Sequence, residues 1–288
     1  MLIQPFDAPI GADVLDLHLA EISDIEFEQI HDAWLKWGVL RFRNQQLTDE
    51  TLKTFSSRFG ELEYAPHGRV SQEELAKIPN PFVATISNIV ENGKPIGGLS
   101  NLETSWHTDM SYIEQPPTAS LLYAVEVPRY GGETSFCCMR TAFADLPNEL
   151  RKRCANLQIK HDAAHDSIGK LRRGHDPFDS AKDAPGVYHP ALIAHPETHE
   201  SALFLGRRQF AYIDGLTVDE SEALLDAIWK HVAQAHQCWT QRWKRGDLVV
   251  WDNRVVMHRR ASFPNVERRL MRRTQVRATA RPTPALAR

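Results

Sequence analysis

Short apolar segments recur along the chain, separated by polar stretches and by glycine or proline. The segment at 38–43 alternates apolar and polar residues, which is typical of a strand with one buried face. Residues 119–127 form a nearly continuous apolar run, which indicates a buried strand. The remaining expected strands lie at 82–86, after the turn at 131–132, at 188–194, at 202–205 and from 246 onward.

Several helices are marked by their N-terminal residues. In a capping box, a Ser or Thr and the residue three positions later bond reciprocally to each other's backbone. Ser23 with Glu26 predicts a helix to about Lys36, and Thr217 with Glu220 predicts another. The other helix signals are Thr48 with an end near Gly60, a box of Ser71 and Glu74 closed by Pro79, helical character from Thr141, and Pro147 as the first residue of a further helix.

Many short strands with helices set outside them suggest a β-sandwich or jelly roll. We therefore expect a mainly β fold with flanking helices, in the form of a double-stranded β-helix (jelly roll). A chain of 288 residues can build one large core, so a single domain across residues 1–288 is expected. The polar stretch 161–187 is interpreted as an excursion from this core. The loop-rich stretch 61–102, with an Asn92–Gly93 turn, is equally typical of a lid and of a plain surface loop.

Composition is that of an ordinary globular protein, with 42% hydrophobic and 25% charged residues. The sequence has no apolar run of 18 residues and no secretory signal, so we expect a cytoplasmic protein without a membrane span. Four cysteines without C-x-x-C spacing favour reduced thiols over a zinc knuckle or disulfides. A formal net charge of -3 argues against general nucleic-acid binding, and the sequence leaves open whether the chain forms a homo-oligomer.

Candidate chemistry centres on Ser105–Asp109, where a histidine and a carboxylate are two residues apart. If this stretch is extended, His107 and Asp109 project from one face and can bind one ion. The best third ligand is His258, at the end of a later apolar run. Two histidines and one carboxylate form the facial triad of non-haem Fe(II) oxygenases. The H-x-D triplet alone is weak evidence, because 13 histidines make a chance triplet unsurprising and most histidines are structural.

Nine arginines lie between Arg254 and Arg281, and they allow two interpretations. One is a solvated or nucleic-acid-binding basic tail. The other is directed to the site, because a 2-oxo acid co-substrate with a distal carboxylate calls for a buried cationic group, which arginine supplies bidentately. Arg269 follows His258 by eleven residues and Arg273 lies four further on, so a strand would hold both on one face. Spacing alone does not choose between the two interpretations.

Several stretches, taken together and in order, resemble those of a known family. They are Trp106–Asp109, Gly131–Thr134, Gly246–Arg254, His258 and Arg268–Thr274. On these residues the chain is similar to the Fe(II)/2-oxoglutarate dioxygenases that include taurine dioxygenase and 2,4-dichlorophenoxyacetate dioxygenase. Ile86–Asn88 and Met139–Phe143 resemble the phenoxyacetate branch more closely than the taurine branch.

The resemblance implies a role for each matching residue. By it, His107, Asp109 and His258 bind Fe(II). Thr134 and Arg269 bind the distal carboxylate of the co-substrate 2-oxoglutarate. The substrate-binding residues it implies are Arg273, facing the anionic head of the prime substrate, and Met110, for which an ordinary core position is an equal alternative.

The implied reaction consumes O2 and converts 2-oxoglutarate to succinate and CO2 while a C–H bond of a small anionic substrate is hydroxylated. A carboxylate at Asp109 favours hydroxylation, because halogenases of this general type leave that position open for halide. If the attacked carbon bears an ether oxygen, the hydroxylated product collapses and the ether bond breaks.

Two departures from the taurine branch argue against sulfonate recognition. Glu103 stands where that branch has asparagine, and Ala65 stands where it has a histidine before the proline matching Pro66. His67 is close by, but we interpret it as a surface histidine. The stretch Gly206–Tyr212 has no counterpart in the resemblance and assigns no substrate.

We therefore expect a dioxygenase acting on an aryloxyalkanoate-like carboxylate, with taurine, an alkanesulfonate or an alkyl sulfate as alternatives. From the residues alone, two other classes stay open. A zinc hydrolase can use two histidines and a carboxylate with one open position. A non-catalytic binding module would use the arginines for an acidic partner.

Overall fold

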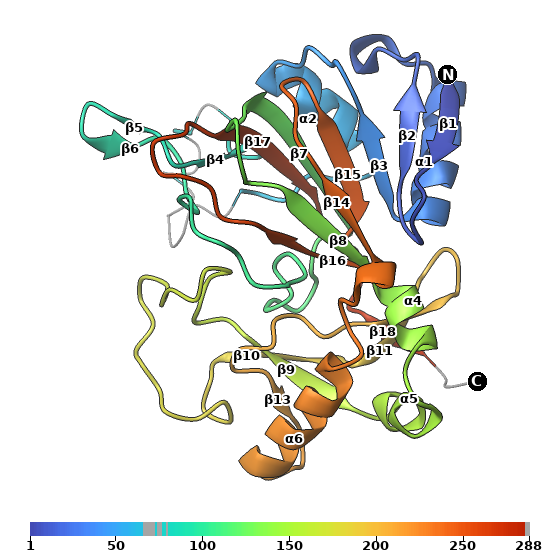
Figure 1. The fold of residues 1–288 in the computed structure, drawn as a ribbon, viewed down its shortest axis with the longest axis vertical. Helices are drawn as coiled ribbons and strands as arrows, with labels where there is room; N and C mark the ends of the chain where they lie inside the picture. The colour runs from blue at the N-terminus through green and yellow to red at the C-terminus, as the bar shows by residue number, and fades with distance from the viewer. Residues whose placement is uncertain (66–72, 74–76, 79, 286–288) are drawn as a thin grey trace.

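Two β-sheets that share an apolar core dominate the upper half of the molecule in Figure 1. The computed structural model describes residues 1–65, 73, 77–78 and 80–285. The larger sheet has seven strands in the order β1 (Leu2–Pro5), β2 (Ala12–Leu15), β3 (Val39–Phe42), β15 (Leu248–Asp252), β7 (Ala119–Glu126), β17 (Leu270–Val276) and β4 (Ala84–Ser87). The smaller sheet has three, in the order β14 (Cys238–Gln241), β8 (Thr134–Cys138) and β16 (Val256–Arg260). The fold is mainly β, as the sequence predicted.

Smaller elements complete the molecule. One three-stranded sheet has the order β10 (Gly186–Pro190), β9 (Gln158–Asp162) and β13 (Tyr212–Ile213), and another has β12 (Ser201–Leu203), β11 (Leu192–Ala194) and β18 (Thr283–Pro284). β5 (Val90–Glu91) and β6 (Lys94–Pro95) form a hairpin. In the part of the chain that the structure describes, the helices with stated bounds are α1 (Asp24–Trp37), α2 (Asp49–Ser57), α4 (Met139–Ala144), α5 (Asn148–Cys154) and α6 (Val218–Trp229), and η1 (Leu19–Glu21) and η2 (Ala235–Gln237) are short 3-10 turns. Among the described residues, no helix combines the length and apolarity that a membrane crossing requires.

The larger sheet is covered on both faces, which explains the continuous apolar run of β7. Leu121 and Tyr123 belong to the apolar cluster that packs α1 and α2 against one face. Leu122 and Ala124 point the other way, into the cluster shared with the smaller sheet. Because successive side chains of a strand alternate between faces, burial of both faces makes every position apolar. The core between the two sheets is where the candidate site lies.

The helix signals of the sequence agree with the structure at most positions. Ser23 with Glu26 and Thr217 with Glu220 form complete capping boxes at α1 and α6. Thr48 caps α2, where its reciprocal partner is Thr51. Pro147 is the N-cap of α5 and precedes the first helical residue by one position. The proposed box of Ser71 and Glu74, Pro79, Pro66 and His67 lie outside the described residues.

The stretch 105–109 differs from the expectation of an extended segment. Only His107 pairs like a strand residue, in an isolated antiparallel bridge with His258, and the chain turns from Asp109 onward. The bridge has both backbone hydrogen bonds, at 3.0 and 2.9 Å. The side chains of His107 and Asp109 therefore come together because His107 lies in a bridge and Asp109 in the turn that follows it. They do not come together through the alternation of side chains along a strand.

Candidate active site and metal centre

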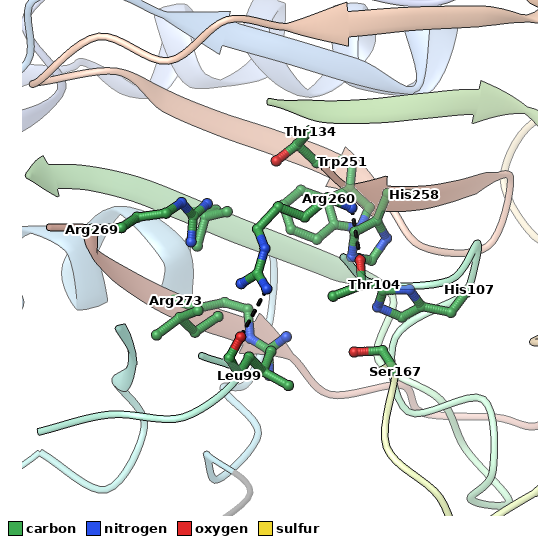
Figure 2. A pocket seen from close by; sticks show the side chains of 12 residues that line it. Leu99, Thr104, His107, Thr134, Ser167, Trp251, His258, Arg260, Arg269 and Arg273 are labelled. Carbon is green, nitrogen blue, oxygen red and sulfur yellow. Dashed lines mark hydrogen bonds between the residues drawn. The ribbon is translucent and has the colours of Figure 1, made fainter. Parts of the chain in front are cut away.

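A pocket opens between the two sheets, and its walls come from strands that are distant in sequence (Figure 2). β16 supplies His258, β8 supplies Thr134, β15 supplies Trp251 and β17 supplies Arg273. His107 reaches the same space from its bridge beside β16. The sheet pairing thus concentrates residues from the middle and the end of the chain in one cavity.

His107, Asp109 and His258 form a compact group of possible metal ligands. One ligand atom from each residue lies within 4.8 Å of the other two. Oδ1 of Asp109 is 3.8 Å from Nε2 of His107 and 3.9 Å from Nε2 of His258. Two imidazole nitrogens and one carboxylate oxygen on one side of an ion form the donor set of a facial triad.

Neighbouring groups orient these side chains. The ring nitrogen Nδ1 of His107 lies 2.8 Å from the carbonyl oxygen of Ser105, and a proton on Nδ1 leaves Nε2 free as a ligand. Ser120 Oγ donates to Oδ2 of Asp109 at 2.7 Å, which leaves Oδ1 directed at the histidines. Nδ1 of His258 is buried and has no hydrogen-bond partner among the described residues.

The turn at Asp109 is held by one buried side chain. Asn253 Oδ1 accepts a hydrogen bond from the backbone N–H of Asp109 at 2.8 Å. Asn253 Nδ2 donates to the carbonyl oxygens of Asp109 and Pro117, both at 2.9 Å. Asn253 directly follows β15, so this amide connects the H-x-D turn to the strand that leads to His258.

Burial and charge set the protonation states of the three side chains. Burial lowers the pKa of His107, and it lowers the pKa of His258 to about 3, so both imidazoles are neutral at pH 7. Burial alone would raise the pKa of Asp109, but the charge of Arg273 and the Ser120 hydrogen bond hold that pKa below its usual range. Two neutral imidazoles and an ionised carboxylate are what a divalent cation requires.

Arg269 and Arg273 both line the pocket, as the site-directed interpretation expected. Arg269 is 1% exposed, and its Nε and Nη2 have no hydrogen-bond partner among the described residues. Thr134 Oγ1 accepts a hydrogen bond from Trp243 Nε1 at 3.0 Å, so its own proton is free to be donated elsewhere. Arg273 Nη1 donates to Oδ1 of Asp109 at 3.1 Å, a contact that no local sequence pattern predicts.

Other residues singled out in the sequence lie elsewhere. Met110 follows the carboxylate with a left-handed φ of 49° and is not among the side chains lining the pocket, so its role stays a prediction. Glu103 is exposed and pairs with Arg259 at 3.3 Å. Ala65 is buried, and its N–H donates to Pro81 O.

The stretch 206–212 has structural contacts. Arg207 donates to the carbonyl oxygens of Asp162 and Asp166, and Arg208 pairs with Glu222 and Asp226 of α6. The stretch 206–212 therefore connects the polar segment 161–187 and helix α6 to each other.

Sequence reasoning missed Arg260, which also lines the pocket. The sequence could have predicted this position, because Arg260 lies two residues after His258 in the same expected strand and therefore on the same face.

The residues present fit an Fe(II) ion with a 2-oxo diacid. The donor set of His107, Asp109 and His258 suits Fe(II). The unpartnered guanidinium atoms of buried Arg269 suit a carboxylate, because a buried charge is stable only when it is paired. Such a site in a mainly β scaffold defines the class of non-haem Fe(II) oxygenases that use a 2-oxo acid.

Comparison with known proteins identifies the family. Residues 2–275 match the family model described as "Taurine catabolism dioxygenase TauD, TfdA family". The chain belongs to this family. The expectation of an Fe(II)- and 2-oxoglutarate-dependent dioxygenase, and the resemblance that supported it, are thereby confirmed.

Two curated relatives and one solved structure cover nearly the whole chain. A "(S)-phenoxypropionate/alpha-ketoglutarate-dioxygenase" of Sphingobium herbicidovorans is 30% identical over 291 residues, 99% of this chain and 98% of the relative. An "Alpha-ketoglutarate-dependent 2,4-dichlorophenoxyacetate dioxygenase" of Cupriavidus pinatubonensis is 31% identical over 286 residues, 95% of this chain and 96% of the relative. The crystal structure of AAD-2 in complex with Mn(II) and N-oxalylglycine matches with a TM-score of 0.82 at 27% identity, covering 98% of this chain and 99% of that one.

Proposed function

We propose that this chain is an Fe(II)- and 2-oxoglutarate-dependent dioxygenase that hydroxylates a small anionic substrate, an aryloxyalkanoate-like carboxylate. The observation that carries the proposal is one pocket lined by both histidines of the two-histidine, one-carboxylate group and by buried Arg269, whose Nε and Nη2 are unpartnered among the described residues. When bound together, Fe(II), 2-oxoglutarate and O2 supply the oxidative decarboxylation to succinate and CO2 that is coupled to hydroxylation.

In this proposal His107, Asp109 and His258 hold the metal. Arg269 and Thr134 bind the distal carboxylate of 2-oxoglutarate and so fix the direction of the co-substrate in the pocket. Two observations support this orientation of the co-substrate. Both side chains are buried, and the Thr134 hydroxyl accepts a hydrogen bond from Trp243, so its own proton can be donated to a ligand.

Arg273 is proposed to bind the anionic head of the prime substrate. Its Nη1 donates to Oδ1 of Asp109, the oxygen that also faces both histidines. A metal ion held by Asp109 would compete for this oxygen and would leave the Arg273 guanidinium free for a substrate carboxylate. Met110 stays a candidate for the substrate side because it directly follows Asp109.

Both curated relatives are named for aryloxyalkanoates, which supports a substrate with an ether oxygen next to the attacked carbon. Hydroxylation at that carbon gives a hemiacetal, and its collapse breaks the ether bond. Taurine, an alkanesulfonate or an alkyl sulfate is the second candidate, because the family description itself names taurine catabolism. Family membership argues against the zinc hydrolase and the non-catalytic binding module.

We also propose that residues 1–288 form one dioxygenase domain with a double-stranded β-helix (jelly roll). The family match over 2–275 and the site between the seven-stranded and three-stranded sheets support this proposal.

The test is succinate release with Fe(II), 2-oxoglutarate and O2, each omitted in turn. Aryloxyacetates and aryloxypropionates form one arm, and taurine, alkanesulfonates and alkyl sulfates form the other. Succinate formation that depends on all three reagents and rises most with an aryloxyalkanoate, together with release of the phenol, is expected. Highest turnover in the sulfur arm would replace the substrate proposal, and no succinate with any substrate would overturn the proposed activity.

A further inference from the structure

β16 carries a second side chain into the pocket beyond its proposed metal ligand. His258 and Arg260 are buried while Arg259 between them is exposed, so the first two share the inner face of the strand. Arg260 is the register partner of Thr134 on β8, as His258 is of Phe136. Two residues along a strand span about 6.6 Å, close to the length of a five-carbon diacid. Arg260 thus lies beside Thr134, away from the metal ligands.

The guanidinium of Arg260 is buried without a carboxylate partner among the described residues. The side chain is 5% exposed, and Nη2 donates to the carbonyl oxygens of Leu99 and Leu102. Within the part of the chain that the structure describes, its Nε has no hydrogen-bond partner, and the same is true of Nε and Nη2 of Arg269. Figure 2 shows both guanidinium groups directed into the same space.

Two buried cations in one cavity repel each other unless an anion joins them. Burial, and then the charge of Arg260, lower the pKa of Arg269 to about 9. An anionic group between the two guanidinium groups removes this repulsion and supplies acceptors to the unpartnered nitrogens.

We propose that Arg260 is a second arginine for the distal carboxylate of the co-substrate, so that Arg260, Arg269 and Thr134 together select a 2-oxo diacid over a 2-oxo monoacid. This inference rests on the proposed function. The register position of Arg260 beside Thr134 favours the co-substrate over the prime substrate. Arg273, by contrast, lies on β17 and contacts the metal side of the pocket through Asp109.

The test compares 2-oxoglutarate with 2-oxovalerate, which keeps the chelating end and has a methyl group in place of the distal carboxylate. Binding of each to Mn(II)-loaded protein without O2 is measured by titration calorimetry, so that no turnover is needed. The variants are Arg260→Met, which removes the charge, and Arg260→Lys, which keeps it. Arg259→Met is the matched control, because Arg259 is the exposed neighbour on the opposite face.

We expect Arg260→Met to weaken 2-oxoglutarate binding by about tenfold or more while 2-oxovalerate binding is unchanged. Arg260→Lys should retain most of the preference, and Arg259→Met all of it. Arg260 also donates to the carbonyl oxygens of Leu99 and Leu102. If its role were merely structural, the two Arg260 variants would weaken the binding of 2-oxoglutarate and of 2-oxovalerate equally. That result would overturn the inference, and so would unchanged 2-oxoglutarate binding with a raised KM for the prime substrate. A failure of the proposed function can be told apart from a failure of this inference. In the first case the wild-type protein itself would bind 2-oxoglutarate no more tightly than 2-oxovalerate.

Discussion

Asp109 is held by contacts to each part of the residue. Arg273 contacts Oδ1, Ser120 contacts Oδ2, and Asn253 holds the backbone. Because the backbone contacts do not use the carboxylate, replacement of the side chain should leave the turn in place.

We therefore predict that Asp109→Ala abolishes turnover and Mn(II) binding while the fold is retained. Succinate release, metal titration and far-UV circular dichroism measure the three quantities. Asp176→Ala removes another carboxylate beside a histidine, at an exposed position, and should leave all three unchanged. Full activity of the Asp109 variant would exclude the carboxylate from the metal site.

Arg269 and Arg273 should act on different ligands, the co-substrate and the prime substrate respectively. Arg269→Gln should raise the KM for 2-oxoglutarate by about 10- to 100-fold, because a hydrogen bond to a charged group contributes about 1.5–3 kcal/mol. Arg273→Gln should raise the KM for the prime substrate by a similar factor. Steady-state kinetics with each substrate varied in turn measures both effects, and equal effects on both KM values would contradict this division.

Among the elements, the connection from β15 to β16 holds the turn that carries Asp109. Asn253 in this connection makes three hydrogen bonds to the segment 109–117, and it is 1% exposed. A buried polar group left without its partner costs about 1–3 kcal/mol. The loss of Asn253 leaves three backbone groups without this partner at once.

We predict that Asn253→Ala lowers the free energy of unfolding by about 3 kcal/mol and weakens Mn(II) binding as well. Asn253→Asp keeps the acceptor for the Asp109 N–H but loses the donors to two carbonyl oxygens, so it should also destabilise the protein. Urea unfolding and metal titration measure these effects, with exposed Asn156→Ala as control. A destabilised variant with unchanged Mn(II) affinity would mean that the turn does not position the ligand.

The sequence predicted the elements more reliably than their pairing. Capping boxes at Ser23 and Thr217 depend on residues three positions apart, so the sequence contains all the information. The bridge between His107 and His258 joins residues 151 positions apart, and no local pattern specifies it. The H-x-D spacing predicted that His107 and Asp109 lie close together, and they do. The extended conformation predicted for this stretch was wrong, because Asp109 lies in a turn. The contact of Arg273 with Asp109 likewise depends on β17 pairing with β7.

At the scale of the whole molecule, a buried ionic network links the large sheet to the lower half of Figure 1. Asp252, the last residue of β15, accepts hydrogen bonds from His195, which follows β11, and from Arg254. Arg254 also pairs with Glu197 at 2.7 Å. Nδ1 of His195 accepts from the backbone N–H groups of Glu197 and Thr198, so the ring proton is on Nε2 and is donated to Asp252.

This network should make the stability of the molecule depend on pH. Burial would raise the pKa of Asp252, but the charge and hydrogen bonds of Arg254 and the hydrogen bond from His195 hold that pKa below its usual range. The unfolded chain therefore binds the proton more tightly than the folded one, and the stabilisation is complete above the unfolded pKa of about 3.9 and is lost as the pH falls towards the folded value.

We predict that Asp252→Asn lowers the free energy of unfolding at pH 7 by about 3–5 kcal/mol, because one partner of a buried ionic network is removed. The variant should also lose less stability than the wild type between pH 7 and pH 3, because it lacks the carboxylate that takes up a proton in the unfolded chain before it does so in the folded one. Urea unfolding at several pH values measures both effects. Asp24→Asn, at a 94% exposed carboxylate paired with Arg58, should change stability by less than about 1 kcal/mol. If the wild type and the Asp252 variant instead lose equal amounts of stability as the pH falls, the acid-sensitive group lies elsewhere in the molecule.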